Sequence, residues 1–485
     1  MHLSNLASAA NLSIADSHAD IEITGLCLDS RQCTPGNLFA ALPGTAVDGQ
    51  RFISDAIANG CSAILTSSPV DNLPENVACL VTPNPRQALG NMAATFYTPL
   101  PSHIAAVTGT NGKTSVAYFC QQLWNALGKT AASIGTIGIY KGNSALSDSA
   151  LTTPDPITLY RTLSELQQQH ITHIALEASS HGLNQQRLAG LPVTVAAFTN
   201  LSRDHLDYHK DMAAYLDAKM TLFSELLQPG GTAVLNADIP EYLQLHDVCE
   251  KRGIRVSSYG YNGETIRLDA IEPLDNGMSC TVTIDGRSHT FTLPLMGEFQ
   301  ALNVCCAIGM VMAEGVAGAD ILAACPQLHA VRGRMQQVAM THTGASVIID
   351  YAHTPDALSH ALQALRPHCN GTLWVVFGCG GNRDAGKRPE MGKIAGEYAD
   401  RVIVTDDSPR HENPAAIRAA TLAACPQGKE IADRAEAIDY AVTHASEGDV
   451  ILIAGKGHET YQLIGDTKHP FDDAEIAIQC VSCHA

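Results

Sequence analysis

The sequence predicts an α/β protein with three domains, and two observations support this. Apolar runs of strand length alternate with helical stretches along most of the chain, a pattern typical of mostly parallel sheets with helices on both faces. The chain has 485 residues, too many for one hydrophobic core, and a typical domain of about 150 residues gives three. We therefore expect a small α/β domain, a central domain and a doubly wound third domain.

The first domain is expected to span residues 1–98 as a small α/β unit. Turn residues separate short apolar runs, which predict strands and one helix. The strands are expected at 23–28, 38–42 and 62–66, and the helix at 52–59. A proline-containing segment, 97–102, marks the first boundary.

The other two domains are expected at 99–327 and 328–485, with a break near Pro326. In the central domain the clearest strands are expected at 103–108, 172–177, 193–199 and 231–236. In the third they are expected at 347–350, 373–378, 401–405 and 450–454. Each strand of the third domain precedes a loop and a helical pattern, which indicates a Rossmann-like, doubly wound fold.

The charge balance restricts the partners of the chain. Thirty Lys and Arg against 49 Asp and Glu give a formal charge of −19, which repels a phosphate backbone, so we expect no nucleic-acid partner. Residues 1–15 lack the basic and apolar regions of a secretory signal, and no apolar run has the length of a membrane span. We expect a cytoplasmic protein without a membrane span, acting as a monomer.

A glycine-lysine turn follows the apolar run 103–108. It lies between a predicted strand and a helix that begins at Lys113, and backbone N–H groups in such a turn bind phosphate together with the positive helix end. Lys113 supplies charge for the β- and γ-phosphates, and Thr114 is placed to bind Mg²⁺. Val107 stands where the longer phosphate-loop pattern has glycine, and a chance glycine turn is the alternative. The predicted ATP-binding residues here are Gly109, Thr110, Asn111, Gly112, Lys113, Thr114 and Ser115.

Two further polar side chains are predicted at strand ends beside this loop. Glu177 ends the predicted strand 172–177, and His205 follows the strand 193–199. Ligand crevices form at the carboxyl ends of parallel strands, and carboxylates and imidazoles bind divalent metals. Taken alone, Glu177 is equally a helix cap or an ion-pair partner, and single histidines are usually structural. Their shared position favours a metal site.

The segment TGTNGKT at 108–114 resembles the ATP loop shared by Mur ligases and folylpolyglutamate synthases. EASSH at 177–181 and N-x-x-x-D-H-L-D at 200–207 resemble Mur ligase segments whose acid and histidine bind magnesium. The family also has a carbamylated lysine, which maps to Lys219, where carbamylation turns an ammonium into an anion. The resemblance implies these catalytic residues: Lys113, Glu177, His205 and Lys219. The implied magnesium ligands are Thr114, Glu177, His205 and Lys219.

Other segments resemble those by which Mur ligases bind a UDP-linked cell-wall precursor, UDP-N-acetylmuramoyl-dipeptide. LDSR at 28–31 and GTAVDG at 44–49 resemble the uridine pocket of the family, which makes the first domain the uridine-binding one. Hydroxyl groups and a guanidinium elsewhere suit the phosphates and carboxylates of the precursor. The implied precursor-binding residues are Leu28, Ser30, Thr45, Ala46, Val47, Thr152, Thr153, Ser179, Gln185 and Arg187.

Three later segments, 297–303, 332–335 and 350–356, resemble the contacts of the family with adenine, ribose and phosphate. Asp350 ends an apolar strand, which is consistent with a carboxylate that faces the ribose. The implied further ATP-binding residues are Asn303, Arg334, Asp350 and His353.

The third domain has three polar loops at predicted strand ends, at 380–384, 406–413 and 455–459. Arginine pairs with a carboxylate through two hydrogen bonds, and an acid supplies the charge for an ammonium. The loops resemble those of the family member that adds meso-diaminopimelate, with Ser408 in place of asparagine in its D-N-P-R motif. The implied diaminopimelate-binding residues are Arg383, Asp407, Ser408, Pro409, Arg410, Gly455 and Glu459.

The implied reaction begins with attack of the precursor carboxylate on the γ-phosphate of ATP, assisted by Mg²⁺ and Lys113. The amine of diaminopimelate then attacks the acyl phosphate. Lysine is the alternative amino acid, but it has no second carboxylate to pair with Arg410. The sequence also leaves open a folylpolyglutamate-type ligase and a non-enzymatic sensor of the precursor.

Overall fold

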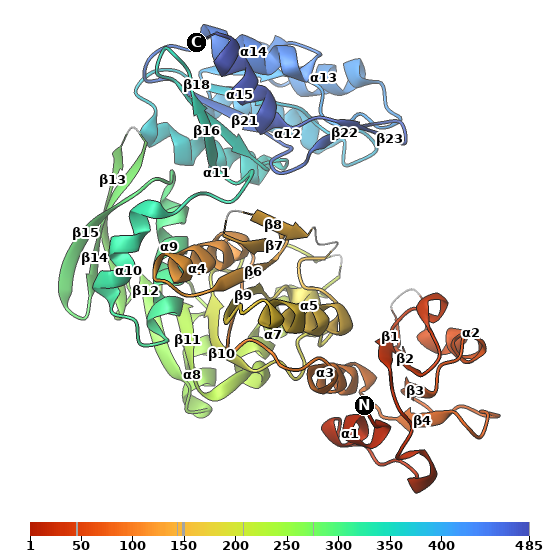
Figure 1. The fold of residues 1–485 in the computed structure, drawn as a ribbon. Coiled ribbons are helices and arrows are strands. Elements are labelled where there is room, and N and C mark those ends of the chain that lie inside the picture. The colour runs from red at the N-terminus through yellow and green to blue at the C-terminus, as the bar shows by residue number, and fades with distance from the viewer. Residues whose placement is uncertain (45–46, 143, 148–150, 207, 275, 485) are drawn as a thin grey trace. The chain divides into compact units, whose positions relative to one another are not determined.

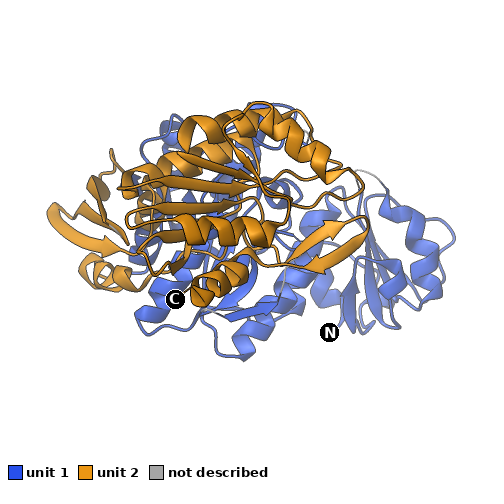
Figure 2. Ribbon diagram, turned by 90° about the horizontal axis from the view of Figure 1, so that it is seen from above, with its two compact units in different colours: residues 1–259, 306–316 blue, residues 260–305, 317–485 orange. Residues whose placement is uncertain are grey.

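The computed structural model describes residues 1–44, 47–142, 144–147, 151–206, 208–274 and 276–484. The chain forms two compact units, coloured separately in Figure 2. Unit 1 comprises residues 1–259 and 306–316, and unit 2 comprises residues 260–305 and 317–485. The division falls within helix α9 (Glu298–Met312), which therefore contributes residues to both units.

The N-terminal part of unit 1 contains a parallel sheet in the order β1-β2-β3-β4 (Figure 1). Its strands are β1 (Gly25–Cys27), β2 (Asn37–Ala41), β3 (Ala63–Thr66) and β4 (Ala78–Val81). The helices are α1 (Leu3–Ala9), α2 (Ile53–Ala58) and α3 (Pro85–Phe96). The three strands and the helix predicted from the sequence are present with slightly different ends, and β4 was not predicted.

The rest of unit 1 is built on eight of the eleven strands of a second sheet, in the order β12-β11-β10-β5-β9-β6-β7-β8. Its strands are β5 (His103–Thr108), β6 (Ala131–Gly135), β7 (Gly138–Lys141), β8 (Ser144–Ser147), β9 (His173–Glu177), β10 (Val193–Phe198), β11 (Leu227–Asn236) and β12 (Arg255–Gly260). Pairing is parallel from β12 to β6, and β7 and β8 form an antiparallel edge. The helices are α4 (Lys113–Ala126), α5 (Pro156–Gln168), α6 (Ser180–Asn184), α7 (Met212–Thr221) and α8 (Tyr242–Lys251).

Strand β5 lies between β9 and β10, and this position determines where the site forms. All five residues of β5 from Ile104 to Thr108 are buried, as expected for a strand whose two faces are both covered. Because the three strands are parallel, their carboxyl ends meet at one edge of the sheet. The glycine-lysine turn after β5, Glu177 at the end of β9 and Thr199 after β10 therefore lie together.

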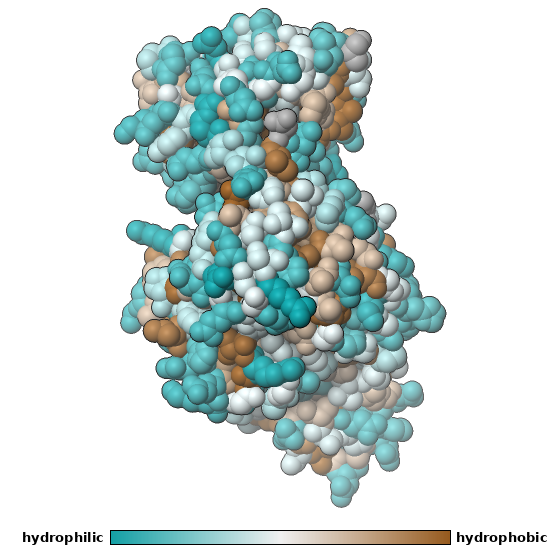
Figure 3. All heavy atoms as spheres, turned by 90° about the vertical axis from the view of Figure 1, so that its left-hand side faces the viewer, coloured by the Kyte–Doolittle hydropathy of each residue, from teal (hydrophilic) through white to brown (hydrophobic). Residues whose placement is uncertain are grey.

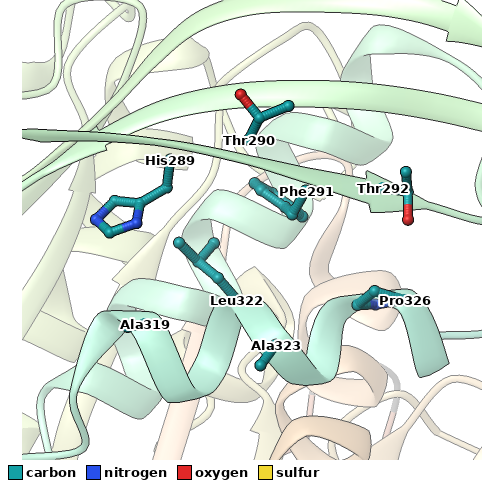
Figure 4. Close-up of a pocket in the computed structure, with 8 residues that line it drawn as sticks. All are labelled: His289, Thr290, Phe291, Thr292, Ala319, Leu322, Ala323 and Pro326. Carbon is teal, nitrogen blue, oxygen red and sulfur yellow. The ribbon is translucent and has the colours of Figure 1, made fainter.

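Unit 2 begins with the other three strands of the second sheet, which pair antiparallel with one another and which the sequence pattern did not predict. They are β13 (Ile266–Leu274), β14 (Gly277–Ile284) and β15 (Arg287–Leu293). Residues of β14 alternate between buried and partly exposed, which indicates one covered face. Helix α10 (Gly318–Ala324) packs beside β15, and a shallow hollow of about 470 Å³ opens between them (Figure 4). Its lining is mostly apolar and contains none of the predicted site residues.

The larger sheet of unit 2 has six strands in the order β16-β17-β21-β18-β19-β20. They are β16 (Gln336–Met340), β17 (Ser346–Asp350), β18 (Leu373–Phe377), β19 (Arg401–Val404), β20 (Lys429–Glu430) and β21 (Val450–Ala454), with only β16 antiparallel among the strands described. The helices are α11 (Pro355–Leu365), α12 (Lys387–Tyr398), α13 (Pro414–Leu422), α14 (Arg434–His444) and α15 (Asp473–Cys483). A small hairpin, β22 (Tyr461–Ile464) and β23 (Thr467–Pro470), precedes α15.

Successive residues of each central strand in this sheet belong to different cores. In β17, Ile348 packs with α11, α12 and α13, while Val347 and Ile349 pack with α14 and α15. Side chains alternate between the faces of a strand, so an uninterrupted apolar run fills two cores. The doubly wound fold and the mostly parallel α/β class predicted from the sequence are confirmed.

The surface is mixed in character. Hydrophilic and hydrophobic side chains are interspersed over the face drawn in Figure 3. Within the described part of the chain, each helix is too short or too polar to cross a bilayer.

Candidate functional site

The turn after β5 is held in an unusual backbone conformation that two glycines permit. Gly109 has φ 142° and Gly112 has φ 86°. A Cβ atom on Gly109 would lie 1.9 Å from Oγ1 of Thr199, so a side chain cannot replace its hydrogen. Asn200 accepts from the backbone N–H of Thr110 at 2.8 Å and, through Oδ1, from that of Asn111 at 2.9 Å. The residues after β10 thus fix the turn.

Two lysines point their ammonium groups at the same carbonyl oxygen. Lys113 Nζ donates to the oxygens of Gly109 at 2.9 Å and Thr110 at 2.7 Å, and Lys219 Nζ donates to that of Gly109 at 2.7 Å. Lys219 is buried on α7, and its ammonium lies 4.3 Å from the centre of the Tyr215 ring. Burial, with repulsion from Lys113, lowers the pKa of Lys219 to about 6. The predicted Lys113 and Lys219 therefore meet at the loop.

Glu177 is a buried carboxylate surrounded by hydroxyl and amide donors. Thr114 Oγ1 donates to Oε2 at 3.0 Å, and Thr136 donates through its backbone N–H at 2.8 Å and its hydroxyl at 3.1 Å. Burial raises the pKa of Glu177, while the charge of Lys113 and these bonds oppose the rise. A Cβ on Gly135 would lie 1.9 Å from Oε1, so this glycine makes room for the carboxylate. Thr136 was not predicted, because a lone threonine after a strand carries little signal.

His205 has an exposed side chain and a positive φ of 53°. Its Nε2 lies 3.5 Å from Oδ2 of Asp204, and its ring lies edge-on to His181, 4.8 Å between ring centres. The ring centre of Tyr215 is 6.3 Å away, and the Tyr215 hydroxyl lies 3.3 Å from Thr110 Oγ1. The structure thus places His205 near the phosphate loop, with Tyr215 between them, and its described contacts do not include Glu177.

The precursor-binding residues predicted in the central region form one hydrogen-bonded network. Thr152 Oγ1 lies 3.1 Å from Thr136 Oγ1. Thr153 donates to the Glu177 carbonyl at 2.8 Å, lies 3.0 Å from Ser179 Oγ and accepts from the Ser179 N–H. Arg187 donates to the Thr153 carbonyl at 2.6 Å and to Gln185 Oε1 at 2.8 Å. All five residues thereby connect to the segment that carries Glu177.

The predicted uridine-pocket residues belong to the N-terminal sheet. Leu28 follows β1 and is partly buried, and Ser30 is buried, with its carbonyl accepting from Asn59 Nδ2 at 2.8 Å. Val47 is 48% exposed. The predicted Thr45 and Ala46 lie outside the described residues.

Three of the four further nucleotide-binding residues predicted in unit 2 gather around Tyr351. The guanidinium carbon of Arg334 lies 4.7 Å from the centre of its ring, and the His353 ring is 4.6 Å from it. Asp350 accepts from the N–H of Met335 at 2.8 Å and that of Ala352 at 2.9 Å, and burial raises its pKa against the opposing charge of Arg334. The fourth, Asn303 on α9, is buried and donates to Gln300 Oε1 at 3.2 Å. Its described contacts do not join this group.

Arg410 lies in the predicted amino-acid loops with φ 51°. Its Nη1 donates to the Gly381 carbonyl at 2.8 Å, and its backbone N–H donates to Leu463 O at 3.0 Å. Ser408 is buried, and its Oγ accepts from Leu463 N–H at 3.1 Å. The serine that departs from the family motif therefore ties the loop to the β22–β23 hairpin, whereas Arg383 on the neighbouring loop is exposed.

Ion pairs hold these loops, and the sequence did not reveal them. Arg388 on α12 pairs with Glu412 at 2.9 Å, and the same carboxylate accepts from the backbone N–H of Asn382. Arg418 bridges Asp406 and Glu430. In a fourth pair, Arg434 and Asp473 are both fully buried and form two hydrogen bonds of 2.7 Å, while Arg434 Nη2 also donates to Ala454 O at 3.0 Å. Such pairs join distant segments, so local sequence patterns do not indicate them.

The predicted amino-acid loop and the nucleotide-binding residues of unit 2 are packed backbone against backbone. A Cβ on Gly333 would lie 2.2 Å from the Gly457 carbonyl carbon, and one on Gly457 would lie 2.7 Å from Tyr351 Cβ. Gly455 N–H donates to Asp350 O at 3.1 Å, and Lys456 Nζ lies 3.4 Å from Glu459 Oε2. A Cβ on Gly455 would lie 3.1 Å from Oδ2 of Asp407, and one on Gly381 would lie 1.9 Å from Pro409 O. Unit 2 thus brings its two predicted residue groups together.

The parallel sheet and its glycine-lysine turn place the chain in the broad class of α/β proteins with a phosphate loop. Three family models match it. They are the Mur ligase family catalytic domain at residues 22–97, the Mur ligase middle domain at 107–311, and the Mur ligase glutamate ligase domain at 333–457. Together they cover most of the chain, and the chain therefore belongs to the Mur ligase family.

Curated relatives resemble the chain over nearly its whole length. A protein of Bradyrhizobium diazoefficiens, named UDP-N-acetylmuramoyl-L-alanyl-D-glutamate–2,6-diaminopimelate ligase, is 49% identical over 461 residues, which is 94% of each chain. A protein of the same name from Zymomonas mobilis is 47% identical over 98% of each chain.

Solved structures agree with the fold. A structure titled as the same ligase has a TM-score of 0.78 at 32% identity and covers 100% of this chain and 99% of its own. A Mycobacterium tuberculosis folylpolyglutamate synthase has a TM-score of 0.60 at 20% identity, with 76% of this chain and 92% of its own covered. This second likeness shows the fold alone.

Proposed function

We propose that this protein is an ATP-dependent ligase that adds meso-diaminopimelate to UDP-N-acetylmuramoyl-L-alanyl-D-glutamate, in peptidoglycan synthesis. The observation that carries the proposal is the combination of family membership, with relatives of that name at 47–49% identity, and the predicted residues that gather in each unit. We also propose domain borders near residues 98 and 327 and a cytoplasmic monomer as the working form.

The phosphate loop supports ATP as the co-substrate. Asn200 occupies the amides of Thr110 and Asn111, so the phosphate-binding amides are those at the start of α4, where the first-turn N–H groups have no partner within the helix. Lys113 adds its charge at the same end. Arg334 lies over the ring of Tyr351, 4.7 Å from its centre, next to the Asp350 carboxylate, and a cation, an aromatic ring and a carboxylate together suit a nucleoside.

The residues around Glu177 fit a magnesium ion. Mg²⁺ prefers oxygen ligands, and Glu177 with the Thr114 hydroxyl supplies two beside the loop. When bound, Mg²⁺ neutralises charge that develops on the transferred phosphoryl group. His205 and a carbamylated Lys219 complete the proposed set. Carbamylation needs the neutral amine, which adds to CO₂ with loss of one proton, and the burial of Lys219 favours that form. The resulting anion would face Lys113.

The chemistry that these residues assist has two steps. The terminal carboxylate oxygen of the precursor forms a bond to the γ-phosphorus of ATP, and ADP leaves. The amine of diaminopimelate then forms a bond to the acyl carbon, phosphate leaves and the amine loses a proton. Lys113 stabilises the charge that moves through the phosphate in both steps. The network of Thr153, Ser179 and Arg187 positions the precursor, which reduces the entropy cost of the encounter.

Arg410 supports diaminopimelate over lysine. Its described guanidinium bonds all use Nη1, so Nε and Nη2 are the donors for a ligand carboxylate, and arginine binds carboxylates with two parallel bonds. Glu459, on the adjacent loop, supplies negative charge for the distant ammonium group. Lysine lacks the carboxylate that this pair of donors requires.

The experiment that tests the proposal follows ADP release by the purified full chain with ATP, Mg²⁺ and the UDP-linked dipeptide. We expect release with meso-diaminopimelate and almost none with lysine or without an amino acid. Lys113→Met should lower kcat by about 10²–10³-fold, as for removal of a group that stabilises transition-state charge. Arg410→Leu should raise KM for diaminopimelate by about 10- to 100-fold, because a charge-assisted pair of bonds is lost.

Arg267, which lies outside the predicted site, provides a matched control for the Arg410→Leu variant. Arg267→Leu changes an arginine on β13, outside the predicted site, and should leave KM unchanged. Release with lysine as efficient as with diaminopimelate would contradict the proposed amino acid. ADP release that does not depend on an added amino acid would contradict the ligase itself. The absence of ADP release with every amino acid tested would also contradict it.

A further inference from the structure

A cluster of two histidines and a glutamate lies at the opposite edge of the central sheet from the phosphate loop. His103 begins β5 and His173 begins β9, and the two are paired directly across these neighbouring strands. Their rings are stacked, 4.3 Å between centres and 13° between planes. Glu314, which follows α9, faces both rings. Neither the predicted site nor the family assignment uses these three residues.

The carboxylate of Glu314 divides its two oxygens between the histidines. Oε2 lies 3.2 Å from His173 Nε2, and Oε1 lies 3.8 Å from His103 Nδ1. The side chains of His173 and Glu314 are only 6% and 9% exposed, while that of His103 is 43% exposed. A buried carboxylate needs a cation beside it, because leaving the charge unpaired is costly. Among the described residues, the ion pairs of Glu314 are with these two histidines.

The second nitrogen of His173 also has a partner. Its Nδ1 lies 2.8 Å from Thr172 Oγ1, which lies near the carbonyl of Thr130 at 3.3 Å. When Nδ1–H donates to this hydroxyl, the lone pair of Nε2 faces the carboxylate, and a cation must lie between them. An outer hydrogen bond of this kind orients and strengthens metal-binding histidines.

We propose that His103, His173 and Glu314 bind a divalent transition-metal ion of the zinc class. Zinc bonds to nitrogen and oxygen are about 2.0–2.1 Å long, which places neighbouring ligands of a tetrahedral ion about 3.3 Å apart. The separation of 3.2 Å between Glu314 Oε2 and His173 Nε2 is close to this value, and one ligand atom of each of the three residues lies within 4.8 Å of the others. Because imidazole lone pairs lie in the ring plane, binding of the ion requires the exposed ring of His103 to rotate out of the observed stack. Its exposure leaves the fourth position to water.

The chemistry of the three ligands separates this site from the proposed magnesium site. Imidazole nitrogen selects zinc, cobalt or nickel, whereas Mg²⁺ prefers an octahedron of oxygen atoms. An ion at this position joins β5, β9 and the segment after α9. It therefore acts as a structural clamp on the strand that leads into the phosphate loop, and it takes no part in the ligase reaction.

The test measures Co²⁺ and Zn²⁺ binding by the metal-free full chain in the presence of excess Mg²⁺. We expect one Co²⁺ with the intense visible absorption of low coordination, displaced by one equivalent of Zn²⁺, and a higher thermal unfolding midpoint with zinc. His103→Ala and Glu314→Gln should each weaken Zn²⁺ binding, measured by calorimetry, by more than about 100-fold. Both changes are mild, so they remain informative if His173→Ala does not fold.

Two matched variants distinguish this site from other histidines. His246→Ala removes the histidine of an exposed group, His246, Asp247 and Glu250, on α8, and His205→Ala removes the one near the phosphate loop. Both should bind Zn²⁺ as the unmodified chain does. Loss of Zn²⁺ binding in His246→Ala or in His205→Ala would overturn the proposal. Unchanged Zn²⁺ binding in both His103→Ala and Glu314→Gln would also overturn it. Absence of any binding would also overturn it and would leave His173 and Glu314 as an ion pair.

Discussion

The phosphate loop of unit 1 and the polar loops of unit 2 are held by different interactions. Neutral groups of the segment after β10 hold the first: Thr199 Oγ1 donates to Asn111 O at 2.6 Å, and Asn200 accepts from two loop amides. Ion pairs hold the second, through Arg388, Arg418 and Arg434. Neutral bonds keep their strength across pH, whereas paired carboxylates lose theirs when protonated. The segment after β10 thus fixes, without adding charge, a loop that already receives bonds from the ammonium groups of Lys113 and Lys219.

The largest effect is expected where the ionic interaction is fully buried. Arg434→Met leaves Asp473 as a buried, unpaired charge and should lower the free energy of unfolding of unit 2 by about 3–5 kcal/mol. Trp124→Phe as a background leaves Trp374 of unit 2 as the only tryptophan, so its fluorescence during urea unfolding reports on that unit. The double variant Arg434→Met with Asp473→Leu should recover most of the stability. Equal stability of the single and double variants would show that the pair is not the main support of this region.

A smaller effect is expected for the neutral interaction in unit 1. Thr199→Val preserves shape but removes the hydroxyl from Asn111 O, which should cost about 1–2 kcal/mol and raise KM for ATP by about 5- to 30-fold. Thr199→Ser retains the hydroxyl and is the matched control. If KM for ATP were the same in both variants, the hydroxyl would not be needed to fix the loop.

The smallest effect concerns pH. The N–H of Asn382 and the charge of Arg388 hold the pKa of Glu412 below 4.5, its ordinary value. A depressed carboxyl pKa contributes stability above the unfolded-state value, and this contribution is lost as pH falls from about 4.5 through the lower folded-state pKa. At pH 7 the thermal unfolding midpoint of Glu412→Gln should therefore lie below that of the unmodified chain. The two midpoints should approach each other as the pH falls. A gap between the two midpoints that stays constant from pH 7 to pH 3 would contradict the charged interaction.

Local sequence patterns predicted many of the buried parallel strands, but they did not predict the antiparallel strands or the long-range contacts. The strands expected at 103–108 and 450–454 have those bounds in the structure, because a parallel strand covered on both faces is a continuous apolar run between turns. The antiparallel β13, β14 and β15 were not predicted, since their half-buried pattern is interrupted by polar residues. The fold class and the family are confirmed.

The residues of the candidate site also fall into two groups, those that the sequence predicted and those that it missed. Residues within contiguous motifs, such as Lys113, Glu177 and Arg410, could be named from the sequence, and their roles remain predictions. Thr136, Thr199 and Tyr351 were missed because each acts through a partner from another segment. The cluster of His103, His173 and Glu314 was missed for the same reason, since its members lie 70 and 141 positions apart along the chain.

Lys113 donates to two carbonyl oxygens of its own turn, 2.9 and 2.7 Å away. An incoming triphosphate therefore competes with the backbone for this ammonium group. The net binding free energy between lysine and nucleotide is smaller because existing hydrogen bonds must first break. This limits how tightly a product such as ADP is retained. The turn thus favours the release of a bound nucleotide as well as its binding.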